Sequence, residues 1–196
     1  MRILPGALVA LALAAPLPAQ TTLRLSAGAT QSTRLVEDNL GGTIELTPAI
    51  APTIALQVSH PAGRGYRVGI EARVASSALE VDDNGAADEL GTLRTLEVMA
   101  LLDGPIARDV HWHAGVGAIL YRPSEETGIF SEGAPTRWQV GAGLTWSRPV
   151  SPSLTVVATG RYAFHPFTTR RLDTLNYGQF QAVHRVGLTL GVERSF

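Results

Sequence analysis

The sequence lacks cysteine and lysine and, beyond its first twenty residues, any long apolar run. Without cysteine the chain has no disulfide framework and no lipid-anchored lipoprotein signal. All 16 basic residues are arginine, against 17 acidic ones, and the resulting net charge of -1 argues against a nucleic-acid-binding protein. No later segment is long and apolar enough to predict a transmembrane helix.

The first 19 residues have the layout of a secretory signal peptide. Arg2 precedes the apolar run ILPGALVALALAAP, and LPAQ follows, with the small Ala19 at the expected cleavage position. The run is too short to span a bilayer and has no stop-transfer flank. We therefore expect residues 1–19 to be removed on export, which leaves one mature domain, residues 20–196.

Strict alternation of apolar and polar residues is the main signal in the mature chain. In RWQVGAGLTWS, residues 137–147, Trp138 and Trp146 fall on one face, and Arg137 and Gln139 fall on the other. A period of two is typical of a β-strand with two unlike faces. The alternation predicts eight strands, near 22–31, 43–59, 65–80, 91–102, 108–121, 136–148, 153–167 and 179–196. It is weaker in the first and fourth of these.

The connections between these strands alternate in character. Short segments rich in proline and glycine, HPAGRG, DGPIA and RPVSPS, follow the second, fourth and sixth strands, whereas longer polar segments follow the odd-numbered ones. Short turns at one end and long loops at the other are typical of outer-membrane barrels. We predict an all-β fold: a single antiparallel up-and-down transmembrane β-barrel of eight strands, with short periplasmic turns and longer extracellular loops.

Volume, charge and aromatic spacing each favour an aromatic face turned toward lipid. An eight-stranded barrel has an interior only just wide enough for side chains, so glycine, serine and threonine fit inside better than tryptophan. An outward arginine near the bilayer midplane costs roughly 2–4 kcal/mol, whereas charges inside the barrel can pair. On a tilted strand, Trp138 and Trp146 are separated by roughly 20 Å along the barrel axis, close to the apolar band of about 25 Å.

Two sets of residues follow from this orientation. The predicted membrane-interface aromatics are Tyr66, Trp112, Trp146 and Phe196 at the periplasmic end, and Trp138, Phe164 and Phe180 at the outer end. The predicted polar network of the lumen is Arg24, Arg67, Glu71, Arg73, Glu97, Arg137, Arg161, Arg185 and Glu193.

Closure of the barrel predicts which of these charges meet. Arg24 and Glu193 lie near the same height on the first and last strands, which must be neighbours, so we expect them to pair. Glu71, Arg73 and Glu97 lie on adjacent strands, where they can form a second cluster. Because each buried charge requires a partner, such a network predicts a narrow or closed channel.

These features resemble the small OmpA/OmpX-like outer-membrane β-barrels, including porin-family barrel domains. The resemblance rests on the signal peptide, the alternating strands, the long outer loops and a final strand that ends at Phe196. It implies an integral outer-membrane protein of a diderm bacterium, which uses its C-terminal strand as the signal for the barrel-assembly machinery and contacts lipopolysaccharide. Arg194 departs from the aromatic or apolar residue usual at that position. We expect a monomer with no cofactor and no nucleic-acid partner.

Two other functions are compatible with parts of the pattern. A soluble, exported, lipocalin-like barrel that binds a small apolar ligand would need an apolar lumen. A lipid-modifying barrel enzyme would need a base near the outer rim, where His165 and His184 are the candidates, but neither has a serine two residues away. His111 and His113 share one face, yet no third metal ligand is readable beside them. We therefore predict a non-enzymatic envelope protein with no metal site.

Overall fold

The protein is built from β-strands. The computed structural model describes residues 20–38, 44–83, 86–124, 130, 135–168 and 181–196. Within these ranges no helix is long and apolar enough to cross a membrane. The described strands are β1 Thr22–Ser32, β2 Val36–Asp38, β3 Ile44–Pro48, β4 Ala51–Gly63, β5 Tyr66–Asp83, β6 Ala86–Ala107, β7 Val110–Pro123, β8 Thr136–Ser151, β9 Leu154–Phe167 and β10 Gln181–Ser195.

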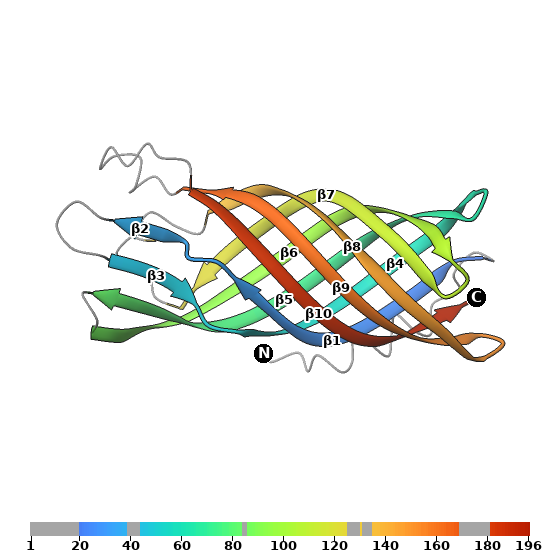
Figure 1. Cartoon of the computed structure of the whole chain (residues 1–196), viewed down its shortest axis with the longest axis horizontal. Helices are drawn as coiled ribbons and strands as arrows, with labels where there is room; N and C mark the ends of the chain where they lie inside the picture. The colour runs from blue at the N-terminus through green and yellow to red at the C-terminus, as the bar shows by residue number, and fades with distance from the viewer. Residues whose placement is uncertain (1–19, 39–43, 84–85, 125–129, 131–134, 169–180) are drawn as a thin grey trace, which may run out of the picture.

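Eight of these strands close into a barrel (Figure 1). β1 pairs with both β4 and β10, successive strands from β4 to β10 pair antiparallel, and every strand of the wall therefore has two neighbours. The short strands β2 and β3 project beyond the wall at the loop end, where β3 pairs with β5. The predicted all-β, eight-stranded, up-and-down barrel is confirmed.

Burial alternates along each strand of the wall. In β10, Arg185, Thr189 and Glu193 are buried, whereas Leu188 and Leu190 between them are exposed. Successive side chains of a strand point to opposite faces, so closure of the sheet places one set in the lumen and the other on the outer surface. The polar set is the one enclosed.

Backbone hydrogen bonds join the two ends of the barrel sequence at the turn end of the wall. The amide of Gln20 donates to the carbonyl of Phe196 at 2.8 Å, and the amide of Phe196 donates to the carbonyl of Thr21 at 3.0 Å. Together with the pairing of β1 and β10, these bonds leave the wall without a free edge there, which is the main structural advantage of a closed sheet.

The hairpins at the turn end are tighter than the sequence predicts. The segments HPAGRG, DGPIA and RPVSPS are mostly strand, and the turns between strands comprise residues 64–65, 108–109 and 152–153. The register of the paired strands shifts beside Pro61, Pro105 and Pro149. Because proline cannot donate to the ladder, it is tolerated at such irregularities, and a proline-rich segment can therefore remain in the wall.

Two boundaries at the loop end also differ from the prediction. Most of segment 82–89, predicted as a loop, is strand, because β5 reaches Asp83 and β6 starts at Ala86. The predicted strand 43–59 is divided into β3 and β4 by a break at residues 49–50, where the amide of Ala49 donates to the carbonyl of Ala78 at 3.0 Å. Polar composition indicated a loop in the first case, but pairing between long strands overrides it.

Candidate functional site

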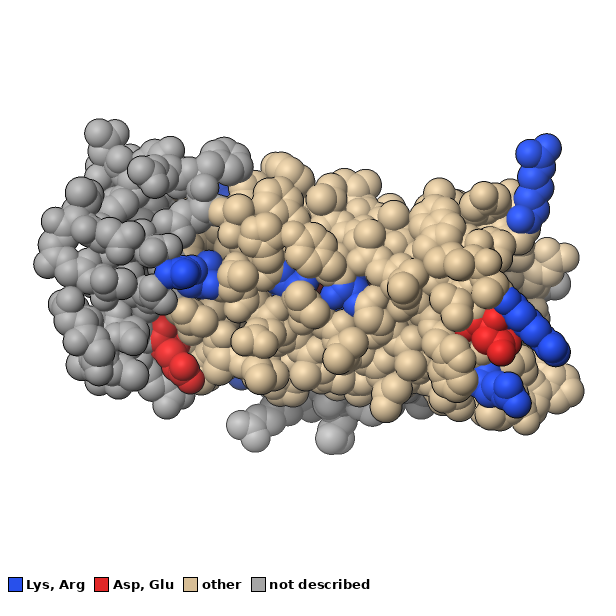
Figure 2. Space-filling view, in the orientation of Figure 1, with Lys and Arg blue, Asp and Glu red and all other residues tan. Residues whose placement is uncertain are grey.

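The outer surface of the wall is apolar between its two ends. In Figure 2 the middle of the visible face is mostly neither acidic nor basic apart from small basic areas, and the acidic side chains lie toward the ends. Exposed apolar side chains of this surface include Ile54, Val58, Ile70, Val74, Val98, Val116, Leu144, Val186, Leu188 and Leu190. They come from strands β4 to β8 and β10, so the surface extends around much of the barrel.

Aromatic side chains border this apolar surface. At the turn end the rings of Tyr66 and Trp112 meet edge to face with 6.4 Å between centroids, and Trp146 is exposed. At the loop end the rings of Trp138 and Phe164 meet edge to face at 6.3 Å. Amphipathic rings at these two levels are typical of the aromatic girdles of membrane barrels.

Phe196, directly after the final strand β10, makes a cation–π contact with Arg194. The guanidinium of Arg194 lies 5.0 Å from the ring centroid of Phe196, a cation–π geometry. An arginine at this otherwise apolar position is therefore accommodated by stacking on the terminal ring. Phe180, predicted for the outer girdle, lies outside the described residues.

Charged side chains at the turn end of the lumen form one connected group. Glu193 accepts hydrogen bonds from Arg24 Nη2 at 2.7 Å and from Arg67 Nη1 at 2.9 Å. Arg67 also donates to Ser59 Oγ at 2.8 Å. Arg24 and Glu193 are paired in the register of β1 and β10, so this ion pair spans the seam between the first and last strands of the wall.

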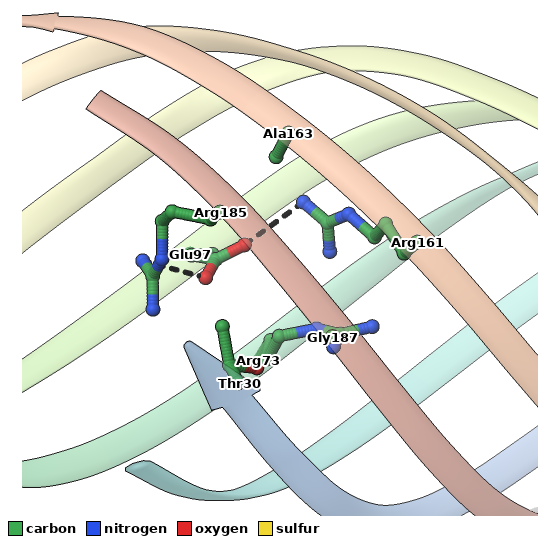
Figure 3. A pocket seen from close by; sticks show the side chains of 7 residues that line it. All are labelled: Thr30, Arg73, Glu97, Arg161, Ala163, Arg185 and Gly187. Atoms are coloured by element: carbon green, nitrogen blue, oxygen red, sulfur yellow. Dashed lines mark hydrogen bonds and ion pairs between the residues drawn. The ribbon is translucent and has the colours of Figure 1, made fainter. Parts of the chain in front are cut away.

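A second charged group crosses the middle of the lumen (Figure 3). Arg161 Nη1 donates to Glu71 Oε1 at 2.7 Å, and Arg161 Nη2 donates to Glu97 Oε2 at 2.8 Å. Glu97 also pairs with Arg185 at 2.8 Å, and Glu71 pairs with Arg73 at 3.2 Å. One guanidinium therefore bridges two carboxylates, and the group links β5, β6, β9 and β10 across the interior.

Glycines on the lumen face leave room for these long side chains. Arg161 is paired in register with Gly143 of β8 and Gly187 of β10. A Cβ atom at Gly187 would lie 3.3 Å from Arg73 Nη1, and one at Gly141 would lie 3.3 Å from Arg161 Nε. The glycines that alternate with outward apolar residues thus supply the volume that the arginines fill.

Arg137, predicted as part of the lumen network, lies apart from both charged groups. It donates to the backbone carbonyls of Thr136 and Thr168 near the start of β8, at the loop end. No carboxylate among the described side chains pairs with it. Backbone carbonyls at the loop end accept its hydrogen bonds instead.

The outer end of the lumen is filled by an apolar cluster that we did not predict. The rings of Tyr121 and Phe130 both lie near Phe167, with centroids 5.2 and 6.2 Å from it. The hydroxyl of Tyr121 is hydrogen-bonded to His165 Nε2. The members that lie on strands occupy the inward-facing positions of the alternation, and this was the sequence signal for the cluster. Its members are Leu35, Leu79, Leu93, Ile119, Tyr121, Phe130, Phe167 and Val183.

Uncharged polar residues of the lumen were also missed. Gln57 Nε2 donates to Asp103 Oδ2, and Gln139 Nε2 donates to Glu97 Oε2, each at 3.2 Å. Both glutamines are buried. Their inward position in the alternation was readable from the sequence, but their partners depend on heights across the barrel, which the sequence does not show.

Solved structures with this fold come from bacterial outer membranes. Neisserial surface protein A matches with a TM-score of 0.57 at 15% identity, covering 91% of this chain and 98% of that one. OprG of Pseudomonas aeruginosa matches at 0.58 and 11% identity, covering 91% and 96%. The outer membrane protein AlkL, determined in lipid bilayers, matches at 0.57 and 14% identity, covering 93% of each chain. No protein-family model and no curated protein matches the sequence.

The chain has the fold of the small outer-membrane β-barrels. Within this outer-membrane barrel fold, side chains are oriented as the aromatic and charge patterns predict: hydrophobic groups outside, charges inside. A lipocalin-like barrel would enclose an apolar site and present its charges to water. The buried ion pairs of Arg161 and the exposed Leu188 and Leu190 do not fit that alternative.

Three histidines of this outer-membrane barrel fold, His113, His165 and His184, contact hydroxyl groups of other strands. His113 is buried, and its Nδ1 lies 3.5 Å from Thr145 Oγ1. His165 and His184, the candidate bases, are each hydrogen-bonded to a tyrosine hydroxyl, and neither bonds a serine within the described part of the chain. That part also holds no group of three or more His, Cys, Asp or Glu side chains placed to bind a metal ion.

Proposed function

We propose that the protein is an integral outer-membrane β-barrel with a non-enzymatic role in envelope structure or surface interaction. The observation that carries this proposal is the orientation of the wall, with apolar side chains outside and ion pairs within. A soluble monomer rarely exposes a contiguous apolar surface of more than several hundred Å². The outer-membrane origin of solved structures with the same fold supports the placement.

Export, assembly and partners belong to the same proposal. Residues 1–19 act as a cleaved signal peptide, and the strand that ends beside Phe196 is the signal for the barrel-assembly machinery. The inserted protein is a monomer surrounded by lipid, with lipopolysaccharide at its loop end and surface contacts made by the loops. A kinship with OmpA/OmpX-like or porin-family proteins closer than the shared fold is also part of this proposal.

A narrow or closed lumen follows from the side chains that fill it. The space beside Thr30, Arg73, Arg161 and Arg185 accommodates about one water molecule. Above this level the apolar cluster around Phe167 packs across the outer end. A hydrated ion would have to break buried ion pairs and then pass an apolar constriction, so we expect little or no conduction.

Cell fractionation tests the placement. The protein expressed with its own residues 1–19 in a diderm bacterium should appear in the outer-membrane fraction. It should also migrate faster on a denaturing gel before boiling than after, because the closed barrel resists detergent. Recovery in the soluble periplasmic fraction would contradict the proposal.

Planar bilayer recordings test the closed lumen. Purified protein should show no conductance at the level of a general porin. Phe130→Ala combined with Phe167→Ala should increase conduction only slightly, because the ion-paired layer formed by Arg161 still blocks the lumen below. Stable porin-like openings of the unmodified protein would contradict a filled interior.

Lipid analysis tests the non-enzymatic role. The side chains of His165 and His184 are each hydrogen-bonded to a tyrosine hydroxyl, and on the proposed non-enzymatic role we expect deletion or overexpression of the gene to leave the acyl composition of lipid A unchanged. A shift in acyl chain number that depends on either histidine would indicate a lipid-modifying enzyme instead.

A further inference from the structure

Two arginines lie side by side on the outer surface of the wall at its loop end. Arg94 of β6 and Arg122 of β7 are directly paired in the antiparallel register. Both are exposed and belong to the outward-facing set of their strands. Like charges directly opposite each other on a sheet destabilise it, so this position is unusual for two cations.

Hydrogen bonds next to the arginine pair hold the register of β6 and β7. The amide of Thr92 donates to Ser124 Oγ at 2.9 Å, and the amide of Ser124 donates to the carbonyl of Thr92 at 2.8 Å. Thr92 and Ser124 lie immediately beyond the arginine pair on the same two strands. Because these bonds hold β6 and β7 in place, the strands cannot shift to separate Arg94 from Arg122.

The surroundings of the pair change from apolar to polar along the wall. Toward the middle of the barrel the next outward pair is Leu96 and Leu120. On the other side of β6, Ser76 of β5 is paired in register with Arg94. Toward the loop end the next residues are Thr92 and Ser124, which are hydrogen-bonded to each other. The two guanidiniums therefore lie between an apolar surface and hydroxyl groups, which matches the boundary between lipid chains and headgroups.

The height of the pair agrees with that boundary. Arg122 follows Trp112 by ten residues on β7. At about 3.3 Å per residue and a tilt of about 40°, this separation is about 25 Å along the barrel axis, the thickness of the apolar band of a membrane barrel. With Trp112 in the periplasmic girdle, Arg122 lies at the level of the outer-leaflet headgroups.

No acidic side chain in the described part of the protein pairs with either arginine. The charged groups of the lumen lie on the opposite face of the wall. The nearest polar neighbour in register is Ser76, which carries no charge. The repulsion between Arg94 and Arg122 is therefore uncompensated by these side chains, and an anion between them would relieve it.

We propose that Arg94 and Arg122, assisted by Ser76, bind a sugar phosphate of lipopolysaccharide in the outer leaflet. The inference rests on the proposed membrane placement and adds a specific lipid site to it. Guanidinium groups bind phosphate through paired, charge-assisted hydrogen bonds. Two of them match the charge of about -1.5 to -2 on a phosphate monoester better than the single charge of a phospholipid diester. The acyl chains of the same lipid would cover Leu96 and Leu120.

Native mass spectrometry of the folded, full mature chain in detergent micelles tests this site. The probe is lipid A that carries two phosphate monoesters, and phosphatidylglycerol is the second arm. Arg94→Gln combined with Arg122→Gln should weaken lipid A binding by about tenfold or more, since both charge-assisted contacts with the phosphate are lost. Arg108→Gln with Arg148→Gln, which removes the same charge from exposed positions near the turns, should leave binding within about twofold of the unmodified protein.

Thermal unfolding gives an independent readout. Lipid A should raise the melting temperature of the unmodified protein and of the Arg108/Arg148 variant. It should raise that of the Arg94/Arg122 variant much less. Without lipid A, the Arg94/Arg122 variant should be at least as stable as the unmodified protein, because its substitutions remove a repulsion.

Several results would overturn the site. Equal loss of binding in both double variants would show that only net charge matters, and equal binding of lipid A and phosphatidylglycerol would exclude selection of a monoester. Unchanged binding in the Arg94/Arg122 variant would remove the site altogether. Heat-modifiable migration of each sample separates these results from failure of the proposed function, in which the unmodified protein would not form a detergent-resistant barrel.

Discussion

At the scale of single residues, the middle of the lumen depends on Arg161. Its guanidinium donates to Glu71 and Glu97, at 2.7 and 2.8 Å, from a position that is almost fully buried. Each of these carboxylates has a further arginine partner. Such an arrangement tolerates burial because every charge has an opposite neighbour, but loss of the shared member affects two carboxylates at once.

Substitution of Arg161 tests this dependence. Arg161→Met should lower the free energy of unfolding by about 3 kcal/mol or more, because it leaves two buried carboxylates with one arginine each. A urea titration of the protein in phospholipid vesicles measures the change. Adding Glu71→Gln should increase the loss, since the buried Arg73 pairs with Glu71 and would then keep no carboxylate partner among the described side chains.

The exposed Arg148 provides the control for this substitution. Arg148→Met should change the free energy of unfolding by less than about 0.5 kcal/mol, as is usual for an exposed position. Similar effects at Arg161 and Arg148 would mean that the bridge contributes nothing.

Glycine at position 143 is required for a different reason. A Cβ atom there would lie 2.2 Å from the carbonyl oxygen of Gly160 and 2.6 Å from the ring of His113. Gly143→Ala should therefore destabilise the barrel by about 1–3 kcal/mol, the usual cost of overpacking. Gly160→Ala, where the added carbon would only touch Leu188 at 3.5 Å, should have a small effect in the same urea titration. A larger loss at Gly160 than at Gly143 would contradict the packing described.

At the scale of the strand, β10 shows how alternation separates two environments. Leu188 and Leu190 are 68% and 69% exposed, whereas Thr189 between them is 4% exposed. A one-residue slip of this strand would exchange the two sets and place leucines among the ion pairs. The register is therefore held from both faces, by apolar groups that face lipid and by Glu193 at the seam.

A charge on the outer face of β10 should have a cost that depends on depth. Leu190→Arg, near the middle of the apolar surface, should lower the free energy of unfolding in vesicles by about 2–4 kcal/mol. Val150→Arg, close to a turn, should cost at most about 1 kcal/mol, because an interfacial arginine reaches water. Equal tolerance at both positions would show that Leu190 faces water.

At the scale of the whole molecule, the sequence was sufficient to predict the barrel but only part of its interior. Alternation around Trp138 and Trp146 is local, so the wall and its two faces could be predicted from neighbouring residues. Arg24 and Glu193 meet because closure joins the first and last strands, whatever the details of the register. The bridge from Arg161 to Glu71 depends on heights across the lumen, and strand register sets those heights.

The hydrophobic cluster at the outer end had a signal that the polar interpretation concealed. Leu79, Ile119 and Val183 occupy inward positions of their strands, so the alternation itself placed them in the lumen. Hydrophobic side chains fill the loop end of the lumen, and charged side chains fill the levels below it. The proline-rich turn segments were also misjudged, because bulges beside Pro61, Pro105 and Pro149 keep them in the wall.

The orientation of the wall can be measured directly, because the chain contains no cysteine of its own. Single cysteines at positions 186 to 192 can be spin-labelled, and the protein reconstituted in vesicles for collision measurements with oxygen and a water-soluble nickel chelate. Labels at positions 186, 188, 190 and 192 should collide with oxygen and be shielded from nickel, whereas labels at 187, 189 and 191 should collide poorly with oxygen. Nickel access at the even positions, or no alternation between the two sets, would contradict a lipid-facing apolar wall around a charged lumen.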